Sequence, residues 1–165
     1  MKKIKLFDPF TNESEKNAIK QIFDSHFWAS GEGVGKVQKF EEKFSKYTSS
    51  KSCVAVNSGT AALNLALSMY NIKNKEVIIP SLSFVSTANA VIENGGIPKF
   101  VDIDEKTLCM DPEKVLKAIS KKTKVILPVH FGGLTSNLGK ISKLCKEHKI
   151  SLVEDAAHAA GSLHQ

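Results

Sequence analysis

The sequence predicts a three-layer α/β/α protein in which helices cover both faces of a largely parallel sheet. Five short apolar segments of strand length alternate with segments whose apolar residues recur at helical spacing. The connections between the strand segments carry no hairpin turn signals, so right-handed β-α-β crossovers are expected. We find no internal repeat, low-complexity stretch or linker, and therefore expect one domain over residues 1–165.

Two amphipathic helices are expected first, over residues 14–27 and 36–47. The stretch "GEGVGK" (31–36) between them looks like a phosphate-binding loop. However, Ser30 stands where that motif needs its first Gly, and Val37 stands where it needs Ser or Thr. We therefore expect a flexible connection between two helices, with Lys36 in solvent.

Strands and helices alternate after residue 50. A continuous apolar run predicts a buried strand over 52–57, and the following segment, 59–70, is apolar nearly all round, as in a helix sandwiched inside a protein. A later helix over 84–96 is closed by Gly95 and Gly96, and another is capped by Asp111 with Pro112 at its first position. The remaining elements are strands at 76–80, 97–104, 124–129 and 150–154 and a helix through Leu138, Ile141, Leu144 and Cys145.

Composition and charge exclude several classes of protein. The chain is 42% hydrophobic and 24% charged, as in ordinary globular proteins. Its three scattered cysteines suggest neither disulfides nor a zinc site, which favours a reducing cytoplasm. The basic start is interrupted by Asp8 and Pro9, and no membrane-spanning run follows. The net charge of +6 comes from scattered lysines without any arginine, which disfavours nucleic acid as a partner.

Candidate binding residues follow the strands, because ligands of open α/β sheets bind outside the carboxyl ends of the strands. These positions are Asn57 to Thr60, Ser81 to Phe84, Asp104, His130, and Asp155 with His158.

The segment "VNSGTAAL" (56–63) runs from a predicted strand into a helix start. Gly59 would let an anion approach the backbone, and the N–H groups of Thr60 and Ala61 at the positive helix end could hold a phosphate. The alternative is that Ser58 or Thr60 merely caps a helix, and the residues alone leave both interpretations open.

Asp155 follows an apolar strand directly, so its carboxylate should be partly buried and should pair with a cationic N–H. The alternative is another helix N-cap. His158 could share the site if the segment makes a helical turn, or could be a buried, hydrogen-bonded histidine. His158 and His164 match no standard metal-ligand spacing, so no metal is predicted.

Five segments, in this order and at these separations, resemble the DegT/DnrJ/EryC1/StrS sugar aminotransferases, which are fold type I enzymes dependent on pyridoxal 5′-phosphate (PLP). The resemblance covers nearly the whole chain, including "GKVQKFEEKF" before the first predicted strand. The segments are "VNSGTAAL", "IIPSLSFVSTANAV", "GGIPKFVDID", "PVHFGG" and "LVEDAAHAAG".

The resemblance implies roles for the matched residues. The Gly59-Thr60-Ala61 turn would bind the PLP phosphate through its backbone, and Phe84 would stack on the pyridine ring, although it would otherwise be taken for a core residue. Asp155 would pair with the protonated ring nitrogen, which keeps the ring an electron sink. His158 would lie near the phenolic oxygen of the ring.

The resemblance also implies an activity. The full protein would transfer an amino group, with glutamate as the expected donor, to a nucleotide-linked keto sugar in polysaccharide or glycan biosynthesis, as a cytoplasmic homodimer. The alternatives are a PLP-dependent nucleotide-sugar dehydratase and a non-catalytic relative. The family's Schiff-base lysine is expected beyond Gln165, so we expect this chain to be the N-terminal part of the large domain, to contain no catalytic residue, and to be inactive and poorly stable alone.

Overall fold

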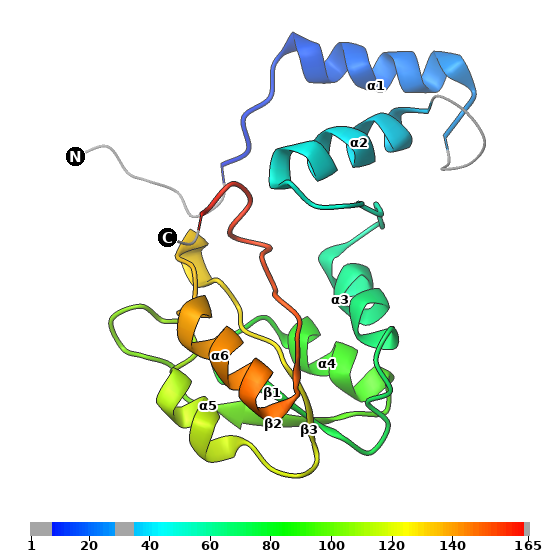
Figure 1. Ribbon diagram of the computed structural model, residues 1–165. Helices are drawn as coiled ribbons and strands as arrows, with labels where there is room; N and C mark the ends of the chain where they lie inside the picture. The colour runs from blue at the N-terminus through cyan, green and yellow to red at the C-terminus, as the bar shows by residue number, and fades with distance from the viewer. Residues whose placement is uncertain (1–7, 29–34, 164–165) are drawn as a thin grey trace. The chain divides into compact units, whose positions relative to one another are not determined.

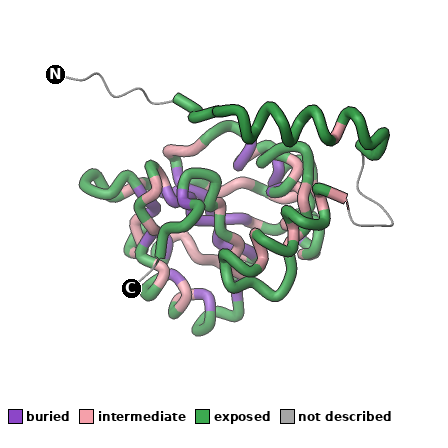
Figure 2. The backbone as a smooth tube through the Cα atoms, turned by 90° about the horizontal axis from the view of Figure 1, so that it is seen from above, coloured by how far each residue is buried: buried purple, intermediate pink, exposed green. Residues whose placement is uncertain are grey.

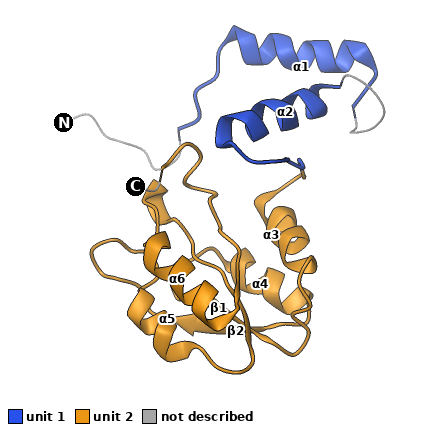
Figure 3. Cartoon of the chain, viewed as in Figure 1, with its two compact units in different colours: residues 1–55 blue, residues 56–165 orange. Residues whose placement is uncertain are grey.

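The computed structural model describes residues 8–28 and 35–163. The chain divides into two compact units (Figure 3), an N-terminal unit of residues 1–55 and a sheet unit of residues 56–165. The assignment of residues 1–165 to one domain stays a prediction. None of the helices in the described part of the chain is long and apolar enough to cross a bilayer.

The N-terminal unit contains the two predicted helices, α1 (Glu13–Ser25) and α2 (Lys36–Thr48). Asn12 caps α1, because its side chain accepts from the Ser14 N–H at 2.6 Å while Glu15 accepts from the Asn12 N–H at 2.6 Å. Lys36 is exposed, as expected, whereas Gly31 to Val34 of the "GEGVGK" stretch lie outside the described residues. None of the residues described in this unit is buried.

The described residues of the sheet unit form four parallel strands in the order β2-β1-β3-β4, and Figure 1 labels the first three of them along the chain. β1 spans Glu76–Pro80, β2 spans Ile97–Val101, β3 spans Thr123–Ile126 and β4 spans Ser151–Leu152. Ile78 of β1 is in register with Lys99 of β2 and Ile126 of β3. The prediction of a parallel sheet built by crossovers is confirmed.

Helices cover both faces of the sheet, which confirms the three-layer prediction. α3 (Gly59–Ser68) and α4 (Val85–Glu93) pack on one face, and α5 (Pro112–Ala118) and α6 (Leu138–His148) on the other (Figure 1). Side chains alternate along β1. Val77 and Ile79 lie in the core that includes residues of α3 and α4, whereas Ile78 lies in the core that includes residues of α5 and α6. The buried residues lie along the strands and the helix sides that cover them (Figure 2).

The helix ends form where their sequence predicts. Asp111 caps α5 by accepting from the Glu113 N–H at 2.8 Å, and Pro112 is the first helical residue. Gly95 has φ +73° just after α4 and donates to the Ile92 carbonyl at 2.8 Å, while the Gly96 N–H reaches the Val91 carbonyl at 2.9 Å. This glycine closure ends α4 before β2 begins.

The predicted strand over 52–57 is wrong. In the described part of the chain no strand pairs with this segment, and Val54 and Val56 are 68% and 40% exposed. An apolar run becomes a strand only when a neighbouring strand supplies hydrogen bonds and both of its faces are covered. The expectation that helix 59–70 is enclosed on all sides is also wrong, because Met69 is 81% exposed.

Candidate functional site

The carboxyl ends of the four parallel strands define one edge of the sheet. α3 leads into the amino end of β1, and its N-terminus therefore faces the opposite, carboxyl edge. Asp155 lies at the same edge, since it pairs with Val129 beyond the end of β3. The side chain of Asp155 reaches α4, which shares a core with α3, so the two predicted binding elements lie on one face of the sheet.

The first amides of α3 are available to an anion. Ser58 caps the helix, because its Oγ accepts from the Ala61 N–H at 3.1 Å and its carbonyl accepts from the Ala62 N–H at 3.0 Å. The N–H groups of Gly59 and Thr60, the first two residues of the helix, have no intrahelical acceptor. A Cβ added at Gly59 would meet nothing within 4 Å, and both Gly59 and Thr60 are exposed, so this end of the helix is accessible.

The cap and the anion site are therefore compatible. The sequence left them as alternatives and expected the Thr60 and Ala61 amides to be free. In the structure the cap occupies the Ala61 N–H, while the positive helix end still presents Gly59 and Thr60. A direct role of the Ala61 amide in phosphate binding stays a prediction.

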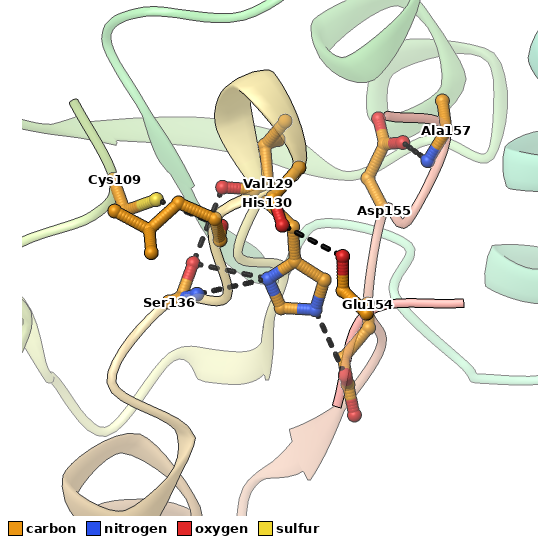
Figure 4. Close-up of polar contacts among 10 residues, drawn as sticks. Cys109, Val129, His130, Ser136, Glu154, Asp155 and Ala157 are labelled. Atoms are coloured by element: carbon orange, nitrogen blue, oxygen red, sulfur yellow. Dashed lines mark hydrogen bonds and ion pairs between the residues drawn. The ribbon is translucent and has the colours of Figure 1, made fainter. Parts of the chain in front are cut away.

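Asp155 is half-buried and held by four hydrogen bonds (Figure 4 shows the one to Ala157). Its Oδ1 accepts from the Ala157 N–H at 3.2 Å and its Oδ2 from the Thr87 hydroxyl at 3.3 Å. In the main chain, its N–H donates to the Pro128 carbonyl at 2.9 Å and its carbonyl accepts from His130 at 3.1 Å. Residues 156–163 form turns and not a helix, so the N-cap alternative for Asp155 is wrong.

Sequence reasoning missed Thr87, which lies in the first turn of α4 and is completely buried. Its Oγ1 is 2.6 Å from Ser83 Oγ as well as 3.3 Å from Asp155 Oδ2. Its backbone N–H donates to the Phe84 carbonyl at 3.1 Å. The sequence does contain a signal for this residue, because Thr87 places a hydroxyl on the apolar side of the predicted helix that follows the second predicted strand.

Phe84 is the N-cap residue of α4 and is 74% exposed, so the alternative of a core residue is wrong. His158 is also exposed, which excludes the buried-histidine alternative. Its Nδ1 accepts from the Gly132 N–H at 3.2 Å, and its ring meets Phe131 edge-on with centroids 5.7 Å apart. Because an amide N–H can only donate, the neutral His158 ring carries its proton on Nε2 and offers it to a hydrogen-bond acceptor. His164 lies outside the described residues.

The other strand-end residues serve the fold. Asp104 accepts from the Lys106 and Thr107 amides, both at 2.9 Å, and closes its own turn. The backbone N–H of Thr107, followed by that of Lys106, lowers the pKa of this carboxyl. His130 is 3% exposed and lies on the opposite face of the sheet from the Asp155 carboxylate, against Ser136 and Glu154 (Figure 4).

A cleft of about 870 Å³ also lies at this end of the sheet unit, beside the starts of α5 and α6. It is lined by Asp111, Glu113, Ser136, Asn137 and Lys140, among others. None of the predicted cofactor residues lines this cleft, so we do not assign the candidate site to it.

A parallel sheet with open helix amides and a half-buried carboxylate at its carboxyl edge is typical of α/β proteins that bind a phosphorylated ligand. The sequence model of the DegT/DnrJ/EryC1/StrS aminotransferase family matches residues 9–165. The chain belongs to this family.

Known relatives agree in sequence and fold. The chain is 41% identical over 152 residues to the spore coat polysaccharide biosynthesis protein SpsC of Bacillus subtilis. It superposes on 3-amino-5-hydroxybenzoic acid synthase with a TM-score of 0.88 and 34% identity. It superposes on GDP-4-keto-6-deoxymannose-3-dehydratase, solved with a trapped PLP-glutamate geminal diamine, with a TM-score of 0.86 and 30% identity.

The chain spans only part of each relative. The matches cover 92%, 93% and 95% of this chain, but 38% of SpsC, 40% of the synthase and 42% of the dehydratase.

Proposed function

We propose that the whole protein is a PLP-dependent aminotransferase that acts on a nucleotide-linked keto sugar, with glutamate as the amino donor, in polysaccharide or glycan biosynthesis. The observation that carries this proposal is the placement of the α3 N-terminus and the Asp155 carboxylate at one edge and on one face of the sheet. Family membership and the relationship to SpsC support the sugar substrate and the biosynthetic role.

The residues of the site fit PLP chemically. The open N–H groups of Gly59 and Thr60 suit its phosphate, and the exposed Phe84 ring suits the face of its pyridine. Each oxygen of the Asp155 carboxylate accepts one hydrogen bond and retains a lone pair for a protonated ring nitrogen. His158 can donate from Nε2 to the phenolic oxygen.

When bound, PLP supplies an electron sink for the reacting carbon of the substrate. The contribution of Asp155 is to keep the ring nitrogen protonated, because a carboxylate beside an N–H group favours its charged form. The α3 amides would hold the phosphate and Phe84 would cover the face of the ring, so that the Asp155 carboxylate would meet the ring nitrogen in a fixed orientation.

We further propose that the protein acts in the cytoplasm as a homodimer. The three cysteines are free in the structure, with Cys109 and Cys145 buried, which fits a reducing compartment. Gel filtration with light scattering on the full-length protein would test the dimer, and a monomer would contradict it.

A sugar dehydratase is the second candidate. It is favoured by the 30% identity to GDP-4-keto-6-deoxymannose-3-dehydratase. The two activities differ in product, because a transferase replaces the keto oxygen of the sugar with an amino group, whereas a dehydratase removes a hydroxyl group from the sugar. Mass spectrometry of the nucleotide sugar after incubation with glutamate and PLP therefore separates them.

The first experiment is a titration of the full-length protein with PLP, followed by absorbance. We expect the wild-type protein to bind PLP. Asp155→Ala should raise the dissociation constant for PLP at least about tenfold, as expected when a charge-assisted hydrogen bond is lost. Asp104→Ala is the matched control, because this strand-end carboxylate closes its own turn and is not among the predicted cofactor residues. Absence of PLP binding, or equal binding by the Asp155 variant, would contradict the proposal. Binding without product would indicate a non-catalytic relative.

A further inference from the structure

We propose that Thr87 is a positioning residue for Asp155, and that its buried hydroxyl fixes the orientation in which the carboxylate meets the ring nitrogen of the cofactor. This inference rests on the proposed function and adds a residue to its site.

The buried hydroxyl of Thr87 lies within hydrogen-bond distance of the Asp155 carboxylate and can hold it in place. The residue is 0% exposed, and its Oγ1 lies 3.3 Å from Asp155 Oδ2 and 2.6 Å from Ser83 Oγ. An ionised carboxylate can only accept hydrogen bonds, so the Thr87 proton points to Asp155. The Thr87 oxygen then accepts the proton of Ser83. The three groups form a chain in one direction, in which each hydrogen bond polarises the next.

This chain limits how the Asp155 carboxylate can rotate. The terminal torsion of an aspartate is broad in the absence of contacts. Here one oxygen accepts from the main-chain N–H of Ala157 and the other from the Thr87 hydroxyl, so both oxygens of the carboxylate are held. Thr87 itself is β-branched, helical and buried, so its rotamer is restricted. Asp155 therefore keeps one orientation before any ligand arrives.

Thr87 also connects the two predicted contacts of the cofactor ring. Its side chain contacts Asp155, which is expected at the ring nitrogen, and its backbone N–H binds the carbonyl of Phe84, which is expected on the ring face. A single residue thus contacts both Asp155 and the main chain of Phe84.

The test uses three variants of the full-length protein. Thr87→Val keeps the shape and removes the hydroxyl, Thr87→Ser keeps the hydroxyl, and Ser86→Ala alters the neighbouring buried hydroxyl of α4. The first measurement is the dissociation constant for PLP. The second is the pH at which the absorbance of bound PLP changes as its ring nitrogen titrates.

We expect Thr87→Val to raise the PLP dissociation constant about tenfold, as for loss of a hydrogen bond to a charged group. The titration of the ring nitrogen should move to lower pH, because a poorly oriented carboxylate stabilises the protonated nitrogen less. Thr87→Ser should restore both properties to within about twofold, and Ser86→Ala should change neither.

The outcomes separate this inference from the function on which it rests. If the wild-type protein does not bind PLP, the proposed function fails and the inference with it. If the wild type binds PLP and Asp155→Ala weakens binding, but Thr87→Val matches the wild type in both measurements, only the inference is overturned. Equal defects in the Val and Ser variants would also overturn it, because they would show a packing role.

Thermal melting checks that each variant folds. If Thr87→Val does not fold, Ser83→Ala replaces it, since this half-buried hydroxyl supports Thr87 from outside the core. Ser83→Ala should then raise the PLP dissociation constant about two- to threefold, the effect of a weak neutral hydrogen bond. An unchanged dissociation constant in that variant would overturn the inference.

Discussion

Nε2 of His130 lies 3.0 Å from Oε2 of Glu154, and this contact joins the segments that follow β3 and β4 on the face opposite the Asp155 carboxylate. The Ser136 N–H donates to Nδ1 of the same ring at 3.1 Å, so the neutral ring carries its proton on Nε2 and donates it to Glu154. The His130 main chain meanwhile binds the carbonyl of Asp155. A buried histidine on one face thus supports the candidate site on the other.

His130→Ala should lower the free energy of unfolding by about 2–4 kcal/mol, because it creates a cavity and leaves the buried Ser136 N–H without an acceptor. Urea denaturation measures this loss. His148→Ala, at the exposed end of α6, is the control and should cost about 0.5 kcal/mol or less. Similar losses in both variants would contradict the structural role of His130.

Gly59→Ala should separate stability from cofactor binding. A Cβ at this position meets nothing within 4 Å, and alanine at a helix start should hold or raise stability by up to about 1 kcal/mol. The same methyl group would occupy the space proposed for the phosphate, so PLP affinity should fall at least about tenfold. PLP titration and thermal melting test both parts. Gly139→Ala, in α6, should leave PLP affinity unchanged.

Gly96→Ala should destabilise the protein by about 1–3 kcal/mol, because the added Cβ would overpack this position. It would lie 2.9 Å from Val91 Cγ1, 3.0 Å from Ile72 Cδ1 and 3.1 Å from the Val91 carbonyl oxygen. Gly95→Ala meets no atom closer than 3.4 Å, and its strain comes from φ +73°, which costs about 1 kcal/mol. Chemical denaturation of both variants should show the larger loss for Gly96→Ala, and the reverse order would refute the packing argument.

Glu76 makes part of the stability depend on pH. Its carboxylate accepts from Ser120 Oγ at 2.5 Å, and from Thr123 Oγ1 and Lys99 Nζ at 3.2 Å each. The Ser120 hydroxyl above all, and then Lys99, hold the pKa of Glu76 below its ordinary value of 4.5, although burial opposes them. A carboxyl whose pKa is lower in the folded state adds stability above its unfolded pKa, and this is lost as pH falls through the folded value.

Glu76→Gln should therefore be less stable than the wild type at neutral pH, and the difference should shrink as the solution is acidified below pH 4.5. Urea denaturation across an acidic pH series measures this convergence. The exposed Glu147→Gln variant is the control and should show little difference at any pH. A Glu76→Gln difference that is independent of pH would contradict the assignment.

The sequence predicted most of the sheet unit, since its helices and strands combine apolar periodicity with local end signals such as Asp111 and Gly95. It failed at residues 52–57, where an apolar run resembles a strand although no neighbour pairs with it in the described sheet. It also could not reveal Thr87, because a hydroxyl acquires its role only when Asp155, 68 positions later, folds beside it.

Glu154 and Asp155 point to opposite faces of the sheet, and this arrangement makes the candidate site depend on the correct register of the last segment. Successive residues of an extended chain point in opposite directions, so sliding the last segment by one position against Val129 would turn each acid to the other face of the sheet. Glu154 would then take the place of Asp155 beside Thr87, and Val153 would take the place of Glu154 beside His130. The main-chain hydrogen bonds that join Asp155 to Pro128 and His130 fix the register of this segment and so oppose such a shift.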